Sequence, residues 1–258
     1  MFFVGIDLGT SSVKLILTDQ NGKVLAEAGK DYRLELPQPG WKEIHPETWW
    51  EATETSLKEL LMDVDASQVE GIGITGQMHT VVLLDADGNS IRPALMWNDI
   101  RTKDLIPVMK SKIKKTGVSF INKFISTGSP AANLLWVKEN ESDKFEKLAH
   151  FLIGPDYLVY RMTGIYGTDF CEASTSSLYD LMKKEWSPEM REIVGLPESV
   201  YPQVRGSAEI VGTVTVAIAE QFGLNPKTKV IVGTGDNPAA AIPTGCLGSE
   251  YPVFSLGT

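Results

Sequence analysis

The sequence predicts an α/β fold, because short hydrophobic strands and amphipathic helices alternate along it, with turn residues between them. Three apolar runs open the chain, and we interpret residues 2–36 as a three-stranded antiparallel meander. The first hairpin is expected to turn through residues 8–12 (LGTSS). Asn21-Gly22, a strong hairpin signal, predicts the second turn.

Helix and strand are expected to alternate after the meander. Pro46 suits the first turn of a helix that places Trp50, Leu57 and Leu61 on roughly one face. A buried strand is predicted over residues 69–75 (VEGIGIT). An Asp-Gly turn then predicts a hairpin over 81–94.

The next hundred residues are predicted to be mostly helical. The helical pattern runs from about residue 100 to 205, with one helix ending at Gly164. A helix over residues 213–222 then leads to a buried strand over 229–234 (KVIVGT). A meander followed by helix, strand, helix and strand describes a ribonuclease-H-like α/β domain with a helical insertion.

A short repeat suggests a second domain. The triplet Leu-Gly-Thr at residues 8–10 recurs at residues 256–258, each time at the end of a short hydrophobic strand. A chance match is one explanation, and a duplicated architecture whose second copy has only begun is the other. On the second explanation, the first domain covers residues 1–248 and the next begins with residues 249–258.

The composition argues against several classes of protein. No run of about 18 apolar residues occurs, so no membrane span is expected, and the first strand does not resemble a signal peptide. The net charge of −9 argues against nucleic-acid binding, because the lysines within residues 110–115 are typical of a solvated helix face. Cys171 and Cys246 have no CxxC spacing, which argues against zinc and suits free buried thiols in a reducing cytoplasm.

The motif DLGTSS has the features of a phosphate-binding turn. Backbone N–H groups around Gly9 and Thr10 can point at a phosphate, and Asp7 can hold a hydrated Mg²⁺ ion. The motif is not a Walker A loop, because GxxxxGK[ST] is absent from the sequence. A plain hairpin turn is the alternative interpretation.

The motif GTGDN places Asp236 directly after a buried strand, at the sheet edge where α/β proteins bind ligands. A carboxylate there can accept the proton of a sugar hydroxyl that attacks a phosphoryl group. The alternative is an N-cap for the following helix, and one aspartate can serve both purposes.

GQMHT and WNDIR combine aromatic, apolar and hydrogen-bonding side chains. Two groups of residues make up this set: Gln77, Met78 and His79 follow a buried strand, and Trp97, Asn98, Asp99 and Arg101 follow the second hairpin. Sugars need flat apolar faces and hydrogen-bonding edges, which this set supplies, although a single histidine or tryptophan is more often structural. His79 has no Cys or His at ligand spacing, so it is not expected to bind a metal ion.

These motifs, in this order, resemble the FGGY-type carbohydrate kinases and, within them, the xylulokinases. The resemblance covers nearly the whole chain and includes GIDLGTSSVK, PGWKEIHPETWW, GITGQMH, WNDIR, DYLVYRMTG and GTGDN. It implies two actin/hexokinase-type domains around a cleft. Residues 1–248 would form the N-terminal sugar-binding domain, and residues 249–258 would begin the ATP-binding domain.

The resemblance also implies roles for single residues. Asp236 matches the catalytic base, Asp7 matches a carboxylate near Mg²⁺ and the phosphates, and Gly9 and Thr10 match the phosphate hairpin. The positions implied for sugar contact are Met78, His79, Asp236 and Asn237, and we add Trp97 and Asn98 from their chemistry. Three departures from the family pattern are Asn133, the Gly154-Pro155 pair and Thr80, of which Thr80 is expected to narrow the sugar pocket.

The implied reaction transfers the γ-phosphate of ATP to O5 of a ketopentose, with D-xylulose as the expected substrate. The expected partners are this sugar and the chain's own C-terminal domain, in the cytoplasm, and this half alone is expected to be inactive. The sequence leaves open a homodimer, a kinase for another sugar such as ribulose, and a non-catalytic sugar-binding module. GQMH, WNDIR and GTGDN argue against acetate-kinase-like and heat-shock-type ATPases.

Overall fold

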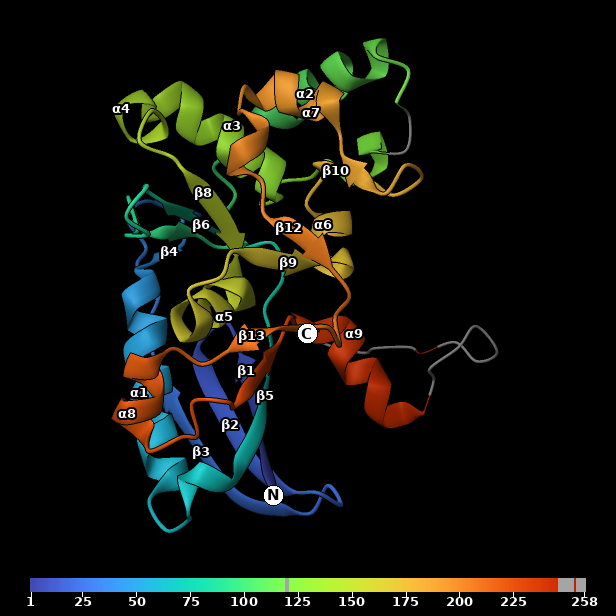
Figure 1. Ribbon diagram of the computed structural model, residues 1–258. Coiled ribbons are helices and arrows are strands. Elements are labelled where there is room, and N and C mark those ends of the chain that lie inside the picture. Colours follow the sequence, from blue (N-terminus) through green and yellow to red (C-terminus); the bar gives the residue numbers. More distant parts are fainter. Residues whose placement is uncertain (119–120, 246–252, 254–258) are drawn as a thin grey trace.

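The computed structural model describes residues 1–118, 121–245 and 253 of the chain. Its lower half in Figure 1 is built on a seven-stranded sheet. The strands β1 (Phe2–Leu8), β2 (Ser12–Asp19) and β3 (Val24–Asp31) pair antiparallel in succession. The predicted meander is therefore confirmed, although its last strand ends five residues earlier than expected, at Asp31. Both of its turns lie where the sequence predicted them.

The rest of the sheet joins β1 on its other side. β5 (Val69–Gly76) runs parallel to β1, and β14 (Lys229–Ile231) and β15 (Thr234–Gly235) run parallel to β5. β13 (Ile210–Thr213), which was not predicted, adds antiparallel to β14 at the edge. The carboxyl ends of β1, β5 and β15 therefore meet at one edge of the sheet, where Gly76 lies opposite both Leu8 and Gly235.

The strand predicted over residues 229–234 is in fact two strands. Between them, Gly233 has φ +83°, and a Cβ on it would lie 2.0 Å from the Ile74 carbonyl oxygen. Only glycine combines this conformation with so close an approach to the neighbouring strand. The break between the two strands changes the direction of the backbone just before Asp236.

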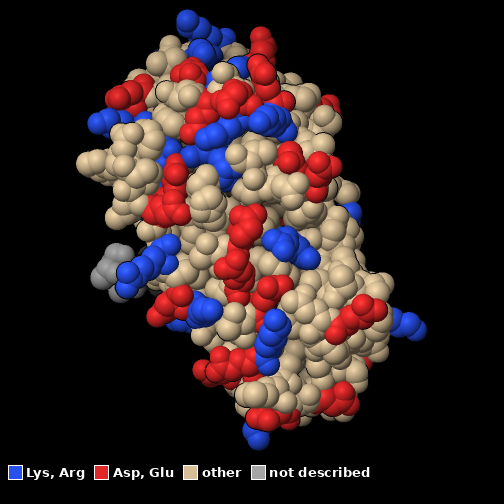
Figure 2. Space-filling model, turned by 90° about the vertical axis from the view of Figure 1, so that its left-hand side faces the viewer, with Lys and Arg blue, Asp and Glu red and all other residues tan. Residues whose placement is uncertain are grey.

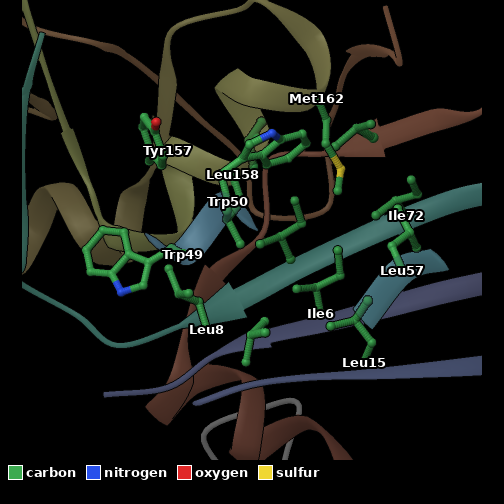
Figure 3. Packing of buried hydrophobic residues seen from close by; sticks show 14 of the residues in the cluster. Ile6, Leu8, Leu15, Trp49, Trp50, Leu57, Ile72, Tyr157, Leu158 and Met162 are labelled. Carbon is green, nitrogen blue, oxygen red and sulfur yellow. The ribbon is translucent and has the colours of Figure 1, made fainter. Parts of the chain in front are cut away.

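One face of the sheet carries the main hydrophobic core. Three helices contribute to it: α1 (Pro46–Leu61), α5 (Gly154–Thr163) and α8 (Val216–Phe222). Figure 3 shows side chains of β1, β2 and β5 facing those of α1 and α5, among them Ile6, Leu15, Ile72, Leu57 and Met162. The helix predicted over residues 213–222 begins only at Val216, because residues 210–213 form a strand and Thr215 caps the helix. On the opposite face of the sheet lies α9 (Asp236–Ala241).

The prediction that residues 100–205 are helical is only partly correct. The helices in this range besides α5 are α2 (Leu105–Lys115), α3 (Pro130–Asn140), α4 (Ser142–Phe145), α6 (Phe170–Thr175) and α7 (Pro188–Val194). Short strands lie between them: β8 (His150–Ile153), β9 (Gly167–Asp169), β10 (Tyr179–Asp180), β11 (Glu185–Trp186) and β12 (Gln203–Arg205). These strands have two to four residues each, too few for their period to be seen in the sequence.

A second, smaller sheet joins the upper and lower halves of the domain. Its strand order is β4-β7-β6-β8, with β4 (Glu43–Ile44), β6 (Val81–Leu84) and β7 (Ala94–Leu95). The predicted hairpin over residues 81–94 is confirmed, since β6 pairs with β7 and Gly88 in its turn has φ +80°. A second hydrophobic cluster fills the space between this sheet and α2, α3 and α7.

The surface is mixed in charge on the face shown in Figure 2, where Lys and Arg side chains are interspersed with Asp and Glu. Three of the four lysines of the predicted solvated face, on α2, are exposed, and Lys110 is partly exposed. In the described part of the chain, no helix has both the length and the hydropathy needed to cross a membrane. Cys171 is a free, half-buried thiol whose pKa burial raises to about 12. Cys246 and the second Leu-Gly-Thr triplet lie outside the described residues.

Candidate functional site

A cavity of about 240 Å³ opens at the sheet edge where β1, β5 and β15 end. We call it the edge cavity. Its lining comes from the turn after β1, the turn after β5, the loop after β7 and the start of α9: Thr10, Gln77, Met78, His79, Trp97, Asp236 and Asn237. Every predicted sugar-contacting residue except Asn98 is therefore in this lining. Asn98 is half-buried, and neither it nor Asp7 nor Gly9 is part of the lining.

Asp236 is the first residue of α9 and is exposed to solvent. Its Oδ1 accepts a hydrogen bond from the backbone N–H of Asn237 at 2.7 Å. The N-cap of α9 is Gly235, so the alternative interpretation of Asp236 as an N-cap is wrong. The carboxylate is thus available to a ligand in the edge cavity.

The turn after β5 has an unusual backbone. His79 has φ +68°, a left-handed conformation that is uncommon for residues other than glycine. The turn is tight, because the Thr80 N–H donates to the Met78 carbonyl at 2.9 Å. Burial lowers the pKa of His79, although the charge of Asp236 and the carbonyl of Thr175 act in the opposite direction. A neutral imidazole can both donate and accept hydrogen bonds, as recognition of a hydroxyl requires.

Hydrogen bonds hold the Trp97 indole over the edge cavity. Its Nε1–H donates to Thr10 Oγ1 at 3.1 Å, and its backbone N–H donates to Thr80 Oγ1 at 3.1 Å. Thr80 is fully buried and does not line the cavity, so the expectation that it narrows the sugar pocket is wrong. Its hydroxyl instead donates to Gln77 Oε1 at 3.2 Å and links the two loops.

Asp99 and Arg101 of the WNDIR motif point away from the edge cavity into a buried group of charges. We call this group the paired-charge network; its members are Glu43, Arg92, Asp99, Arg101 and Glu141. Arg101 contacts Asp99 at 2.8 Å and Glu43 at 2.7 Å, and its guanidinium stacks 3.9 Å from the Trp41 ring centroid. Asp99 also accepts the backbone N–H of Lys42 at 2.6 Å. The network therefore fixes the loop that carries Trp97.

Two side chains hold the turn between β1 and β2 through hydrogen bonds to its backbone. The carbonyl of Gly9 accepts hydrogen bonds from the Tyr32 hydroxyl at 2.5 Å and from Gln77 Nε2 at 3.2 Å. Asp7 lines a neighbouring hollow of about 490 Å³ together with Lys14 and Thr234. Partial desolvation and the charge of Asp236 raise the pKa of Asp7, whereas Lys14 lowers it. Asp7 and Asp236 therefore lie close enough to affect each other.

Gln77, which the sequence placed beside Met78 and His79 without assigning it to sugar contact, lines the edge cavity. One residue near the site was not predicted. Glu172 is 1% exposed and lies behind the cavity on α6. Burial and the charges of Asp156 and Asp169 raise its pKa well above the usual range. The spacing of Asp169 and Glu172 indicates a helix start, and nothing in it indicates proximity to a site.

Comparison with known proteins agrees with this arrangement. Residues 2–243 match the family model described as the FGGY family of carbohydrate kinases, N-terminal domain. Two relatives are the xylulose kinases of Bacillus subtilis, 39% identical over 100% of this chain, and Escherichia coli, 34% identical over 99%. In each case the match covers 52% of the relative, so the chain spans about half the length of the curated relatives it matches.

Solved structures show the same fold. The crystal structure of xylulose kinase from Rhodospirillum rubrum superimposes with a TM-score of 0.88 at 26% identity, covering 96% of this chain and 51% of that one. A structure from Brucella ovis, titled as a xyloylose kinase, gives 0.84 at 31% identity, covering 93% and 48%. The actin/hexokinase-type fold expected from the sequence is thereby confirmed. From the family match and these relatives, we conclude that the chain belongs to the FGGY family of carbohydrate kinases.

Proposed function

We propose that the full-length protein is an ATP-dependent sugar kinase that phosphorylates O5 of a ketopentose, with D-xylulose as the expected substrate. One observation carries this proposal: the edge cavity places the Asp236 carboxylate beside Met78, His79 and Asn237 at the carboxyl edge of the sheet. The names of the relatives support the choice of sugar.

The chemistry of the edge cavity suits a small polyhydroxylated ligand. Met78 and Trp97 offer apolar surfaces for the C–H faces of a sugar. Gln77, His79 and Asn237 offer hydrogen-bonding groups for its hydroxyls. About 240 Å³ is enough for a pentose-sized molecule but too little for a nucleotide, which supports the assignment of this cavity to the sugar.

Asp236 is the proposed catalytic base. A sugar hydroxyl is a poor nucleophile until its proton has an acceptor, and an exposed carboxylate within the edge cavity supplies one. As O5 forms its bond to the γ-phosphorus of ATP, the bond from that phosphorus to the bridging oxygen breaks, ADP leaves, and the O5 proton passes to an Asp236 carboxylate oxygen. The protein's remaining task is to position the reactants and stabilise charge.

The phosphate side is assigned to Asp7, Gly9 and Thr10. Carboxylate oxygens are suitable ligands for Mg²⁺, and the charge of Asp236 that raises the pKa of Asp7 would be offset by a cation. Within the described ranges no cluster of three His, Cys, Asp or Glu side chains is arranged for a metal ion. We assign the ion to Asp7, through water, and to the phosphates of ATP. When bound, Mg²⁺ neutralises charge on the phosphates.

We assign residues 1–248 to the sugar-binding domain and residues 249–258 to the start of the ATP-binding domain, a boundary that falls outside the described residues. The relatives are about twice as long as this chain, which supports a second domain. The 258-residue chain alone is then expected to show no sugar-dependent ADP release and to bind D-xylulose weakly, because no second domain closes over the sugar.

The proposal is tested by Asp236→Asn in the full-length protein, with Asp63→Asn at an exposed position as the matched control. The substitution keeps size and most hydrogen bonding but removes the proton acceptor. In a coupled assay with D-xylulose and MgATP, we expect kcat to fall by roughly 10²-fold or more, with a much smaller change in sugar affinity. Near-normal turnover by Asp236→Asn would show that the base lies elsewhere. Faster turnover with D-ribulose than with D-xylulose would correct the substrate.

A further inference from the structure

One buried carboxyl group contacts both turns that carry the proposed sugar-binding residues. Glu172 lies on α6, where the Asp169 carboxylate accepts its backbone N–H at 2.8 Å and caps the helix. A Cβ built on Gly235 would lie 2.9 Å from Glu172 Oε1 and 2.4 Å from Met78 Cγ. Glu172 therefore packs directly against the residue before Asp236 and next to Met78.

The same carboxyl group faces the turn after β5. The backbone N–H of His79 lowers the pKa of Glu172, against the larger effect of burial, which indicates that the two groups lie near each other. Neither carboxyl oxygen has a hydrogen bond of ordinary geometry to another described residue. The carbonyl of Thr175, one turn further along α6, approaches the His79 imidazole. One short helix thus supports both the backbone and the ring of His79.

Several negative charges act on Glu172. Asp156 of α5, Asp169 of β9 and Asp236 of α9 each raise its pKa, in addition to the larger effect of burial. We call Asp156, Asp169 and Glu172 the acidic cluster. A buried carboxyl in such a setting keeps its proton, and a neutral carboxyl can accept the His79 N–H without adding a negative charge behind Asp236.

We propose that Glu172 is a positioning residue, whose carboxyl joins the Met78–His79 turn to the Gly235–Asp236 turn and thereby sets the shape of the edge cavity. Glu172 does not line the cavity, so it acts through His79 and Asp236 and does not touch the ligand. The left-handed backbone of His79 is uncommon and needs such support from its surroundings. The role in sugar affinity rests on the proposed function, whereas the contact with His79 does not.

Glu172→Met and Glu172→Gln form a matched pair of tests. Both side chains have nearly the size of glutamate and carry no charge, but only glutamine can accept the His79 N–H. In the full-length protein, with D-xylulose and MgATP, we expect Glu172→Met to raise the KM for the sugar about tenfold and to leave the KM for ATP unchanged, because a small misplacement of a binding group is costly. Glu172→Gln should recover most of this loss. Glu192→Gln, at an exposed position on α7, is the control.

A purely structural role predicts a different result. Methionine avoids the cost of burying an acid, so Glu172→Met should not lower the melting temperature. If Glu172 serves the fold alone, the KM values for sugar and ATP should then both stay unchanged. Unchanged KM values would overturn the proposal. Equal damage by methionine and glutamine would also overturn it.

The backbone amide NMR signal of His79, assigned by its loss in His79→Gln, gives a readout that needs no activity. We expect it to move in Glu172→Met and to stay near its original position in Glu172→Gln. If the wild-type protein phosphorylates no sugar but this pattern holds, the proposed function fails and the positioning role stands.

Discussion

Two groups of buried ionisable side chains support the edge cavity. One group is stabilised by ion pairs, and the other by keeping protons on its carboxyl groups. In the paired-charge network, Glu43, Asp99 and Glu141 each contact a guanidinium, from Arg92 or Arg101. In the acidic cluster, burial raises the pKa values of Asp156 and Glu172. Burying an ionised carboxylate without a partner is costly, so a buried carboxyl group is stabilised either by a counter-charge or by keeping its proton.

The difference determines how each side of the edge cavity responds to its surroundings. The loop carrying Trp97 is fixed by ion pairs between carboxylates and guanidinium groups. The turns carrying His79 and Asp236 lie against the Glu172 carboxyl, whose pKa burial raises and whose proton can be lost as the pH rises. We therefore expect the wall of the cavity that these two turns form to respond to pH.

The largest effect should come from breaking the paired-charge network. Arg101 is shared between Asp99 and Glu43, and its side chain is fully buried. Arg101→Met leaves Asp99 without its guanidinium partner and Glu43 with Arg92 alone, and we expect it to lower the free energy of unfolding by about 3–5 kcal/mol. Urea unfolding followed by tryptophan fluorescence measures this. Lys183→Met, which removes a half-exposed partner of Glu189, should cost less than about 1 kcal/mol. Similar costs for the two variants would show that burial of the network is unimportant.

The next effect is the pH dependence of the acidic cluster. Asp156 and Glu172 have raised pKa values in the folded protein, so above about pH 4 the unfolded chain releases their protons before the folded protein does. Stability should therefore fall as the pH rises from about 4 toward the folded pKa values, by up to about 1.4 kcal/mol per pH unit for each group. Asp156→Asn combined with Glu172→Gln should flatten this slope in unfolding curves recorded from pH 4 to 9. An unchanged slope would mean that other groups cause it.

The smallest effect concerns the bond that joins Trp97 to the turn after β1. Trp97 is 45% exposed, so its 3.1 Å hydrogen bond to Thr10 should contribute only about 0.5 kcal/mol. A double-mutant cycle with Trp97→Phe and Thr10→Val, measured on D-xylulose binding by calorimetry, isolates this coupling. Additive effects of the two substitutions would show that the indole is held by its packing and its backbone alone.

Much of the fold and the proposed site could be predicted because the signals were local. The meander, the α1 helix and the strand β5 carry strong turn, cap and periodicity signals, and they were placed correctly. Asp236 directly follows β15, and Met78 and His79 lie in the turn after β5, so the sheet brought them together as expected.

The rest depended on contacts between distant segments. The short strands β8 to β12 exist only through their partners and have no period of their own. Thr80 was assigned to the wrong place because its bond to the Trp97 backbone spans 17 residues. Asp99 and Arg101 look like binding residues in the sequence, and only Glu43, from another strand, shows that they are part of a buried network. Glu172 gave no signal, since its proposed role depends on the approach of Gly235 and His79, which are distant in the sequence.

The contact of Gln77 with the Gly9 carbonyl has a consequence for engineering. Gln77 belongs to the lining of the edge cavity, yet its Nε2 also holds the turn proposed to bind phosphate. If that turn binds phosphate as proposed, a library that randomises Gln77 to accept new sugars would alter nucleotide use at the same time. Selection for a changed sugar preference should therefore vary Asn237 and Met78 first, because the Asn237 amide contacts the Met78 sulfur, at 3.9 Å, whereas Gln77 contacts the phosphate turn. A position that serves two substrates is a poor one at which to separate their recognition.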